Sequence, residues 1–240
     1  MATRLNEMTF SASANLTPNK EKNLSANPAK SYTSPTVVTL FALTTLLLAG
    51  CISSDAQHDA VGQKKSYALE AAIPRTTIPT PCFGPLKILS FKSQPPFEAN
   101  NLIVRRANGE TVMDYYTTWI AAPHELIRVQ TMSYLRKTGL FKAVYDSTSG
   151  SRAQTGLEGT VEQILLDCHA ENPTALITLR FTIIDETTPD FTVLWSTETT
   201  GRSKVEAGPL AIIDAFDKAL SKALEQMTHE LEKSSFQQKK

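Results

Sequence analysis

The sequence TALITLRFTIIDE, residues 174–186, alternates regularly between apolar and polar side chains. Its apolar side chains lie at every second position: Ala175, Ile177, Leu179, Phe181 and Ile183. The positions between them hold Thr178, Arg180 and Thr182. Because successive side chains of a strand point to opposite faces, this pattern predicts a strand with one buried and one solvated face. Such half-buried strands are typical of antiparallel sheets.

Two long segments flank this strand and are expected to be its neighbours in a sheet. Residues 156–170 come first and end near the turn signal Asn172-Pro173. Residues 191–205 follow the turn TPD at 188–190, and Phe191, Val193 and Trp195 continue the apolar face. Three consecutive strands joined by short turns predict an antiparallel arrangement in this half of the chain.

Two segments have the apolar period of a helix. Residues 122–139 carry Pro123 in the first turn and Gly139 just past the end, where these residues favour helix boundaries. Their apolar stripe is Leu126, Ile127, Val129, Met132, Tyr134 and Leu135. After Gly208-Pro209, the second stripe is Leu210, Ile213, Phe216, Leu220, Leu224, Met227 and Leu231. Packing on the sheet is expected for it, and a coiled-coil contact with another protomer is the alternative.

Shorter strands are predicted before the first helix, at residues 86–91, 100–106 and 111–120. The Asn-Gly pair at 108–109 is a hairpin turn signal, because both residues tolerate positive φ. A further strand is expected at 140–147. The order of strands, helix, strands and helix predicts an α+β fold, in which an antiparallel or mixed sheet is covered on one face by two helices.

The segment FALTTLLLAGCISSDAQ, residues 41–57, indicates the compartment. Its apolar run, 37–48, has 12 residues, which is too short for a comfortable membrane crossing of about 20 but suits a secretory signal. The residues before it are net positive, as export requires. Leu48-Ala49-Gly50-Cys51 resembles the bacterial lipobox, in which the cysteine receives a diacylglycerol and fatty chains and becomes the first mature residue. The alternative is a short anchor helix that ends on Cys51 by chance.

These features predict a domain organisation. Residues 1–50 are interpreted as a lipoprotein signal peptide, and 51–85 as a lipid-anchored flexible tether rich in proline. Residues 86–235 would form the folded domain, followed by a polar tail at 236–240. Ile52, which is not the aspartate of the enteric sorting pattern, favours an outer-membrane lipoprotein that faces the periplasm of a Gram-negative-type bacterium.

Charge and cysteine content restrict the function further. Residues 51–240 carry 20 basic and 22 acidic side chains without a clustered basic face, so no nucleic-acid partner is indicated. Cys82 and Cys168 form an even pair in an exported protein, and we expect a disulfide between them. Two free thiols are the alternative.

No catalytic, metal or cofactor site is predicted. The four histidines lack metal-ligand spacing, and signatures of nucleophiles or phosphate loops are missing from the sequence. The segment DYYTTW, residues 114–119, places large side chains on both faces of one strand. Tyr115, Tyr116 and Trp119 are therefore a candidate partner surface. The alternative is a strand buried between the sheet and a helix.

Several soft motifs together resemble the ABC-type transport auxiliary lipoproteins, which are PqiC-like, MCE-associated lipoproteins. After the lipobox these are Tyr67-Ala68-Leu69, the strand 102–105, Trp119 before Pro123, and a helix that ends at Gly139. The resemblance covers about residues 67–235. The chain departs from the pattern at Ala68, where the family has threonine, and at residues 120–122, where it often has an acidic residue.

The resemblance implies a non-catalytic accessory component of an intermembrane lipid transport system. Its partners would be an MCE-type protein, an ABC permease and ATPase, and other copies of itself in a homo-oligomer. A structural or regulatory outer-membrane lipoprotein in envelope assembly is the main alternative, and a periplasmic hydrolase with an unrecognised site is the third.

Overall fold

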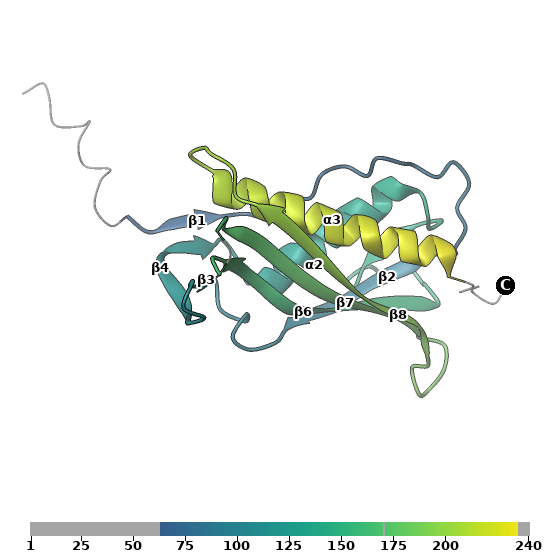
Figure 1. Cartoon of the computed structure of the whole chain (residues 1–240). Coiled ribbons are helices and arrows are strands. Elements are labelled where there is room, and N and C mark those ends of the chain that lie inside the picture. Colours follow the sequence, from purple (N-terminus) through teal and green to yellow (C-terminus); the bar gives the residue numbers. More distant parts are fainter. Residues whose placement is uncertain (1–62, 170, 235–240) are drawn as a thin grey trace, which may run out of the picture. The chain divides into compact units, whose positions relative to one another are not determined.

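The computed structural model describes residues 63–169 and 171–234 of the chain. Contacts divide the chain into the units Met1–Gln57 and His58–Lys240, and every described residue belongs to the second. The elements, shown in Figure 1, are β1 (Lys65–Tyr67), β2 (Leu86–Ser93), β3 (Asn101–Arg105), β4 (Thr111–Trp119), α2 (Pro123–Thr138), β5 (Val144–Asp146), β6 (Thr155–Asp167), β7 (Thr174–Asp185), β8 (Val193–Lys204) and α3 (Ala211–Lys233).

The eight described strands form one mixed sheet organised around the long strand β6. Along one edge of β6, β2 pairs in parallel with its first half, and β3 pairs in parallel with its last two residues. The other edge pairs antiparallel with β7, which pairs antiparallel with β8. β4 joins β3, β1 joins β4, and β5 joins β2. The predicted α+β fold with two helices is confirmed, and the sheet is mixed because β1, β2, β3 and β5 make parallel pairs.

The alternation in β7 has the predicted effect on burial. Its odd-numbered apolar side chains from Ala175 to Ile183 are all buried, whereas Arg180 is exposed. Arg180 lies on the solvated face between Glu162 of β6 and Glu198 of β8, and its guanidinium contacts both carboxylates at 3.3 and 3.1 Å. Cross-strand ion pairs of this kind keep the open face of the sheet polar.

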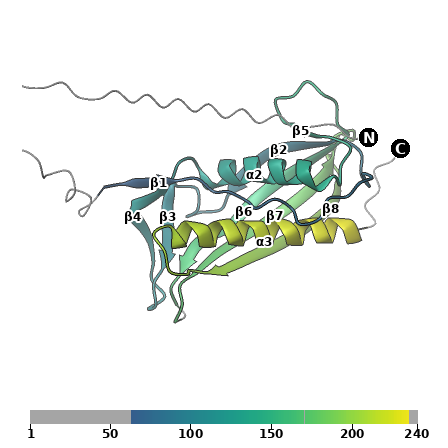
Figure 2. The same cartoon turned by 90° about the horizontal axis from the view of Figure 1, so that it is seen from above.

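Both helices cover the same face of the sheet, as Figure 2 shows. α2 begins at Pro123 and is ended by Gly139, whose φ of 72° is the left-handed conformation that glycine adopts most easily. Ile127, Tyr134 and Leu135 of the predicted stripe are buried, but Val129 is exposed. Val129 lies two residues after Ile127, about 200° away around the helix, so it faces solvent.

α3 packs on β7 and β8 at close range. Of its predicted apolar stripe, the residues from Phe216 to Leu231 are buried and Ile213 is partly buried. Leu210 is exposed, because it precedes the first residue of the helix. Gly201 of β8 lies directly under Ala219 and Ala223, and a Cβ at Gly201 would be 2.7 Å from the Ala219 carbonyl carbon. Small residues on both elements therefore allow the helix backbone to approach the strand. The apolar face packs on its own sheet, as expected, rather than in a coiled coil.

The turn between β3 and β4 also agrees with the sequence. Gly109 has a φ of 85°, and its N–H donates to the Arg106 carbonyl at 2.9 Å. The Asn108 side chain accepts the N–H of Glu110 at 3.0 Å. The Asn-Gly pair thus closes the hairpin as predicted.

The folded unit begins earlier than the predicted boundary at residue 86. β1 pairs with β4 from Lys65 onward, and Leu69 is buried in the core. The N–H of Ile78 donates to Thr138 at 2.7 Å, and that of Cys82 donates to Leu140 at 3.0 Å. Prolines correctly indicated extended chain between residues 73 and 85, but this chain is held on the body. The sequence could not identify the residues that bind this segment, because they lie far along the chain.

The predicted disulfide between Cys82 and Cys168 is wrong, because both cysteines are free thiols. Cys82 precedes Leu86, which pairs with Thr155 at the start of β6, whereas Cys168 follows the last residue of that strand. The strand has 13 residues, and at 3.3 Å per residue its ends lie about 40 Å apart. A disulfide needs Cα atoms within about 7 Å of each other.

Removing the thiol at position 82 should therefore leave stability unchanged. We expect Cys82→Ser to unfold at the same urea concentration as the unchanged protein, with or without reductant. Non-reducing and reducing gels should show one mobility for both proteins. A reductant-dependent shift that Cys82→Ser removes would contradict the position of Cys168 at the far end of β6.

Candidate functional site

The most conspicuous surface feature is a pair of exposed tyrosines on β4. Tyr115 and Tyr116 expose 69% and 52% of their surface, and their rings meet edge to face with centroids 5.2 Å apart. Free aromatic rings of this size are uncommon on a soluble domain and mark contact surfaces. The two tyrosines are therefore accessible, as a contact surface requires.

A bulge in β4 holds the tyrosines outward. Asn101 pairs with Thr118 and Ile103 pairs with Met113, so residues 114–117 of β4 lie opposite Leu102 alone. A segment with so many extra residues must leave the plane of the sheet. The β4 segment can therefore turn both neighbouring tyrosines toward solvent, which a regular strand cannot do.

Hydrogen bonds stabilise this bulge. The Asp114 carboxylate accepts the N–H groups of Tyr116 and Thr117, each at 2.7 Å. The Asn101 side chain donates to the Asp114 carbonyl at 2.9 Å. The backbone groups that the interrupted ladder leaves unpaired are thus partly satisfied, and the tyrosines have a defined backbone conformation.

The segment that precedes β1 lies beside the tyrosines. The Lys64 ammonium is 5.3 Å from the centroid of the Tyr115 ring, a cation–π distance. β1 then pairs with residues 117–119 of β4, and the Ser66 and Thr118 hydroxyls are 2.9 Å apart. We call Lys64, Tyr115 and Tyr116 the aromatic corner. Met113 and Ile120, which flank the tyrosines along the chain, are exposed too.

Trp119 does not belong to this surface, so its prediction as a partner residue is wrong. It is 2% exposed, and its ring meets Phe216 of α3 edge to face with centroids 5.1 Å apart. Beyond the bulge β4 pairs with β1, which lets Trp119 turn into the core. The alternative of a strand buried between sheet and helix therefore holds for Trp119 and fails for Tyr115 and Tyr116.

A second feature is the strap, residues 69–78, which lies along α2 and α3. Three of its N–H groups donate to helix side chains: Glu70 to Asp217 at 2.8 Å, Ala71 to Gln130 at 3.1 Å and Ala72 to Ser221 at 2.8 Å. These bonds replace the backbone partners that a strand would provide. The strap therefore connects the β1 end of the fold to both helices.

Two adjoining cavities, of about 390 and 510 Å³, lie along the strap, and Arg75, Tyr134, Lys222 and Glu225 line both. Burial raises the pKa of the Tyr134 hydroxyl and raises that of the Asp217 carboxyl to about 6. The hydrogen bond from the Glu70 N–H lowers the pKa of Asp217, but it offsets only part of the increase that burial causes. Because the lining carries both charge signs, it favours neither an anionic nor a cationic ligand.

The raised pKa of Asp217 predicts a pH-dependent stability. The fold favours the protonated Asp217 carboxyl, and this preference contributes to the free energy of unfolding. The contribution is complete below pH 3.8, the ordinary pKa of aspartate, and is lost as the pH rises through about 6. Asp217→Asn cannot ionise. It should therefore stabilise the protein by about 1 kcal/mol at pH 7.5 and much less at pH 4.

Urea unfolding at both pH values checks this prediction. Asp190→Asn is the matched control, because Asp190 is an exposed acid in the β7–β8 turn, outside α3. A difference between Asp217→Asn and the unchanged protein that is equal at both pH values would show that burial does not hold the proton on Asp217.

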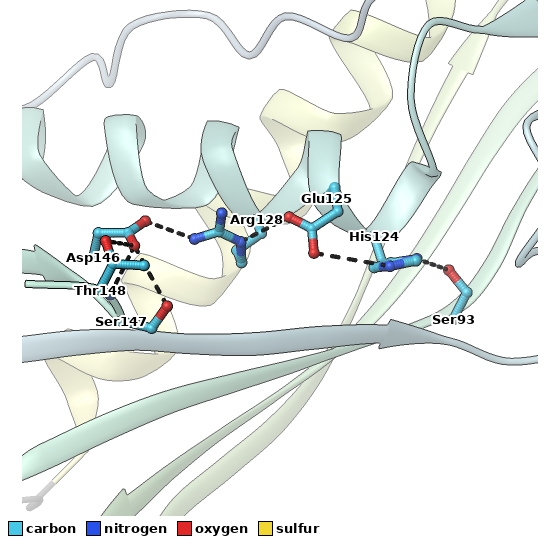
Figure 3. Close-up of polar contacts among 7 residues, drawn as sticks. All are labelled: Ser93, His124, Glu125, Arg128, Asp146, Ser147 and Thr148. Atoms are coloured by element: carbon cyan, nitrogen blue, oxygen red, sulfur yellow. Dashed lines mark hydrogen bonds and ion pairs between the residues drawn. The ribbon is translucent and has the colours of Figure 1, made fainter.

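Figure 3 shows a row of polar contacts along α2. The Ser93 hydroxyl is 3.4 Å from His124 Nδ1, and His124 Nε2 is 3.9 Å from Glu125. Arg128 donates to Glu125 at 3.0 Å and to Asp146 at 2.7 Å. The Arg128 guanidinium and the Thr148 donors hold the pKa of the Asp146 carboxyl well below its usual range.

Serine, histidine and a carboxylate are also the residue types of a nucleophilic triad, so the hydrolase alternative concerns this row. The Ser93 hydroxyl belongs to a side chain that is nine-tenths buried, and the contact from His124 to Glu125 is too long for a hydrogen bond. Through Ser93 and Asp146 the row connects α2 to β2 and β5. Its geometry supports a structural role.

Within residues 63–169 and 171–234, no group of three or more His, Cys, Asp or Glu side chains could hold a metal ion. No helix in this part of the chain has the length and apolar character needed to cross a membrane. Cys51, the signal segment and the tail at 236–240 lie outside the described residues, so their roles remain predictions.

Comparison with solved structures finds two that match this chain with TM-scores above 0.5 and a third that matches below that value. A protein from Xanthomonas campestris, described under the family name DUF330, is 18% identical, with 70% of this chain and 94% of that chain covered and a TM-score of 0.59. A structure described as an uncharacterized protein is 9% identical, with 71% and 99% covered and a TM-score of 0.52. A hypothetical protein from Chlamydia trachomatis is 7% identical, with 63% and 96% covered and a TM-score of 0.47.

The chain has the fold of the Xanthomonas protein. At this sequence identity the likeness extends to the fold alone. No family model and no curated protein sequence matches this chain.

Proposed function

We propose that the protein is a lipid-anchored lipoprotein of the cell envelope and a non-catalytic accessory component of an MCE/ABC-type intermembrane lipid transport system. The observation that carries the proposal is Cys51, which ends the apolar run 37–48 in a lipobox-like sequence. The body that follows has the fold of a DUF330 protein, in keeping with the resemblance to auxiliary lipoproteins.

The described body suits a docking role. It presents a polar sheet face that the helices leave open, while its serine–histidine row is engaged in holding α2. A docking subunit needs a rigid body and a contact surface, and the energy for transport would come from a separate ATPase. The outer membrane is the proposed location, with the body in the periplasm.

Copurification from native membranes tests the transport role. The full chain, tagged after Lys240, would be solubilised in detergent and captured, and the bound proteins and lipids identified by mass spectrometry. We expect an MCE-type protein with its permease and ATPase, and native mass spectrometry of the captured complex should show several copies of this chain. Recovery of barrel-assembly or peptidoglycan-synthesis factors alone would replace this function with the envelope-assembly alternative.

A second experiment tests the anchor independently of any partner. Cys51→Ala in the full chain should abolish fatty-acid labelling and prevent processing at the lipobox, whereas Cys82→Ala, at an exposed thiol within the body, should change neither. Outer- and inner-membrane fractions separated by density would then locate the labelled protein. Equal labelling of Cys51→Ala and the unchanged chain would overturn the lipoprotein assignment.

A further inference from the structure

The aromatic corner joins two features that are usually separate: exposed apolar rings and a fixed orientation. The bulge at residues 114–117 is held by Asp114 and Asn101, so the two tyrosines are presented in a defined direction. Each ring carries a polar hydroxyl at its tip. Tyrosine with this exposure is suited to a boundary that is apolar on one side and wet on the other.

The corner is also the described surface that is nearest along the chain to the proposed anchor. Lys64 contacts Tyr115, and only residues 52–63 separate it from Cys51. A fully extended chain of this length spans at most about 45 Å. Since β1 fixes the entry of the chain beside β4, the corner cannot lie farther from the lipid anchor than this limit.

The positive charges at the start of the folded body are complementary to an anionic lipid surface. Lys64 and Lys65 are both exposed, and they follow each other at the start of the folded body. The Asp114 carboxylate, which precedes Tyr115 in the chain, accepts two backbone N–H groups of the bulge. Lysines next to exposed tyrosines form the combination that anionic headgroups and the interfacial region of a bilayer attract.

We propose that the aromatic corner lies in the headgroup layer of the membrane that carries the lipid anchor. This inference rests on the lipidation of Cys51 in the proposed function. Acyl chains together with an aromatic and basic patch give two attachments, which hold a protein more stably than one. The second attachment orients the body, so that the turn between β7 and β8, at the other end of β6, points away from the bilayer.

Tryptophan quenching in vesicles tests the proposal with the full lipidated chain. Tyr116→Trp places the probe in the corner, and Phe191→Trp is the matched control. Phe191 is 56% exposed, like Tyr116 at 52%, and it lies in the β7–β8 turn. Both variants retain Trp119 and Trp195 as the same background. The vesicles would contain phosphatidylethanolamine and phosphatidylglycerol with brominated acyl chains.

We expect the probe at position 116 to be quenched about twofold more than the probe at position 191, with a blue-shifted emission, as for aromatic rings at a membrane interface. Adding Tyr115→Ser, or raising the salt concentration, should reduce this difference. Equal quenching of the two probes would overturn the proposal. Circular dichroism of each variant confirms that the fold is retained.

Flotation of the same vesicles separates this inference from the proposed function. If the protein floats but the two probes are quenched equally, the lipid anchor is supported and the placement of the aromatic corner in the headgroup layer is contradicted. If the protein does not float, the lipid anchor itself fails. Acrylamide quenching in unbrominated vesicles tests for contact between copies of this chain. If the probe at position 116 becomes better protected from acrylamide as the protein density on the vesicles increases, the corner contacts another copy, and the membrane contact is overturned.

Discussion

Replacing Gly201 with alanine should destabilise the protein by about 3 kcal/mol or more, the upper range for overpacking a core. The added Cβ would clash with the Ala219 carbonyl oxygen and lie 3.1 Å from the Ala223 nitrogen. Those atoms belong to the backbone of α3, so no side-chain rotation relieves the clash. The helix must move away from β8, and the buried face from Phe216 to Leu231 loses its contacts.

Urea unfolding measures this effect, with Gly150→Ala as the control. A Cβ at Gly150 meets nothing within 4 Å, and its backbone does not have the positive φ that disfavours alanine. The control should unfold within about 0.5 kcal/mol of the unchanged protein. If Gly201→Ala unfolded at the same urea concentration as Gly150→Ala, α3 would not rest on β8 at the distance described.

Trp119→Ala should lower the free energy of unfolding by about 3–5 kcal/mol, as truncation of large aromatic residues in protein cores does. The substitution removes the edge-to-face contact with Phe216 and leaves a cavity between β4 and α3. Tyr116→Ala, three residues earlier, should cost less than about 1 kcal/mol, because its ring is half exposed. The pair of variants separates a core role from a surface role on the same strand.

Thermal unfolding and copurification of the two variants check this assignment. We expect Trp119→Ala to lower the melting temperature strongly and Tyr116→Ala to leave it nearly unchanged. A stable Trp119→Ala protein that fails to bind its partner would return Trp119 to the contact surface and would falsify its burial against α3.

The local elements followed from the sequence because each depends on a short-range regularity. The alternation from Ala175 to Ile183 identified β7 and its buried face, and Pro123 and Gly139 marked the ends of α2. The Asn-Gly pair at 108–109 identified the β3–β4 hairpin, since positive φ at Gly109 is a property of the residue itself. The fold class followed from the order of these elements.

The candidate site was predicted only in part, since β4 carries large side chains on both faces. In a pattern of period two, Tyr115 and Trp119 share one face and Tyr116 lies on the other, yet both tyrosines are exposed and Trp119 is buried. The bulge and the contact with Phe216 separate them, and both depend on pairing with other elements. The strap was missed for the same reason, because Gln130, Asp217 and Ser221 accept its bonds from positions far along the chain.

By itself, the sequence determined the two helices and the strands from residue 86 onward, the α+β class and the resemblance of residues 48–51 to a lipidation site, since these depend on neighbouring residues and their periods. Only the tertiary structure decided which large side chains are buried, where the folded body begins and whether two cysteines can meet. Cys82 and Cys168 show the reason most clearly. An even number of cysteines permits a bond, but the length of β6 keeps the two sulfur atoms at opposite ends of the sheet.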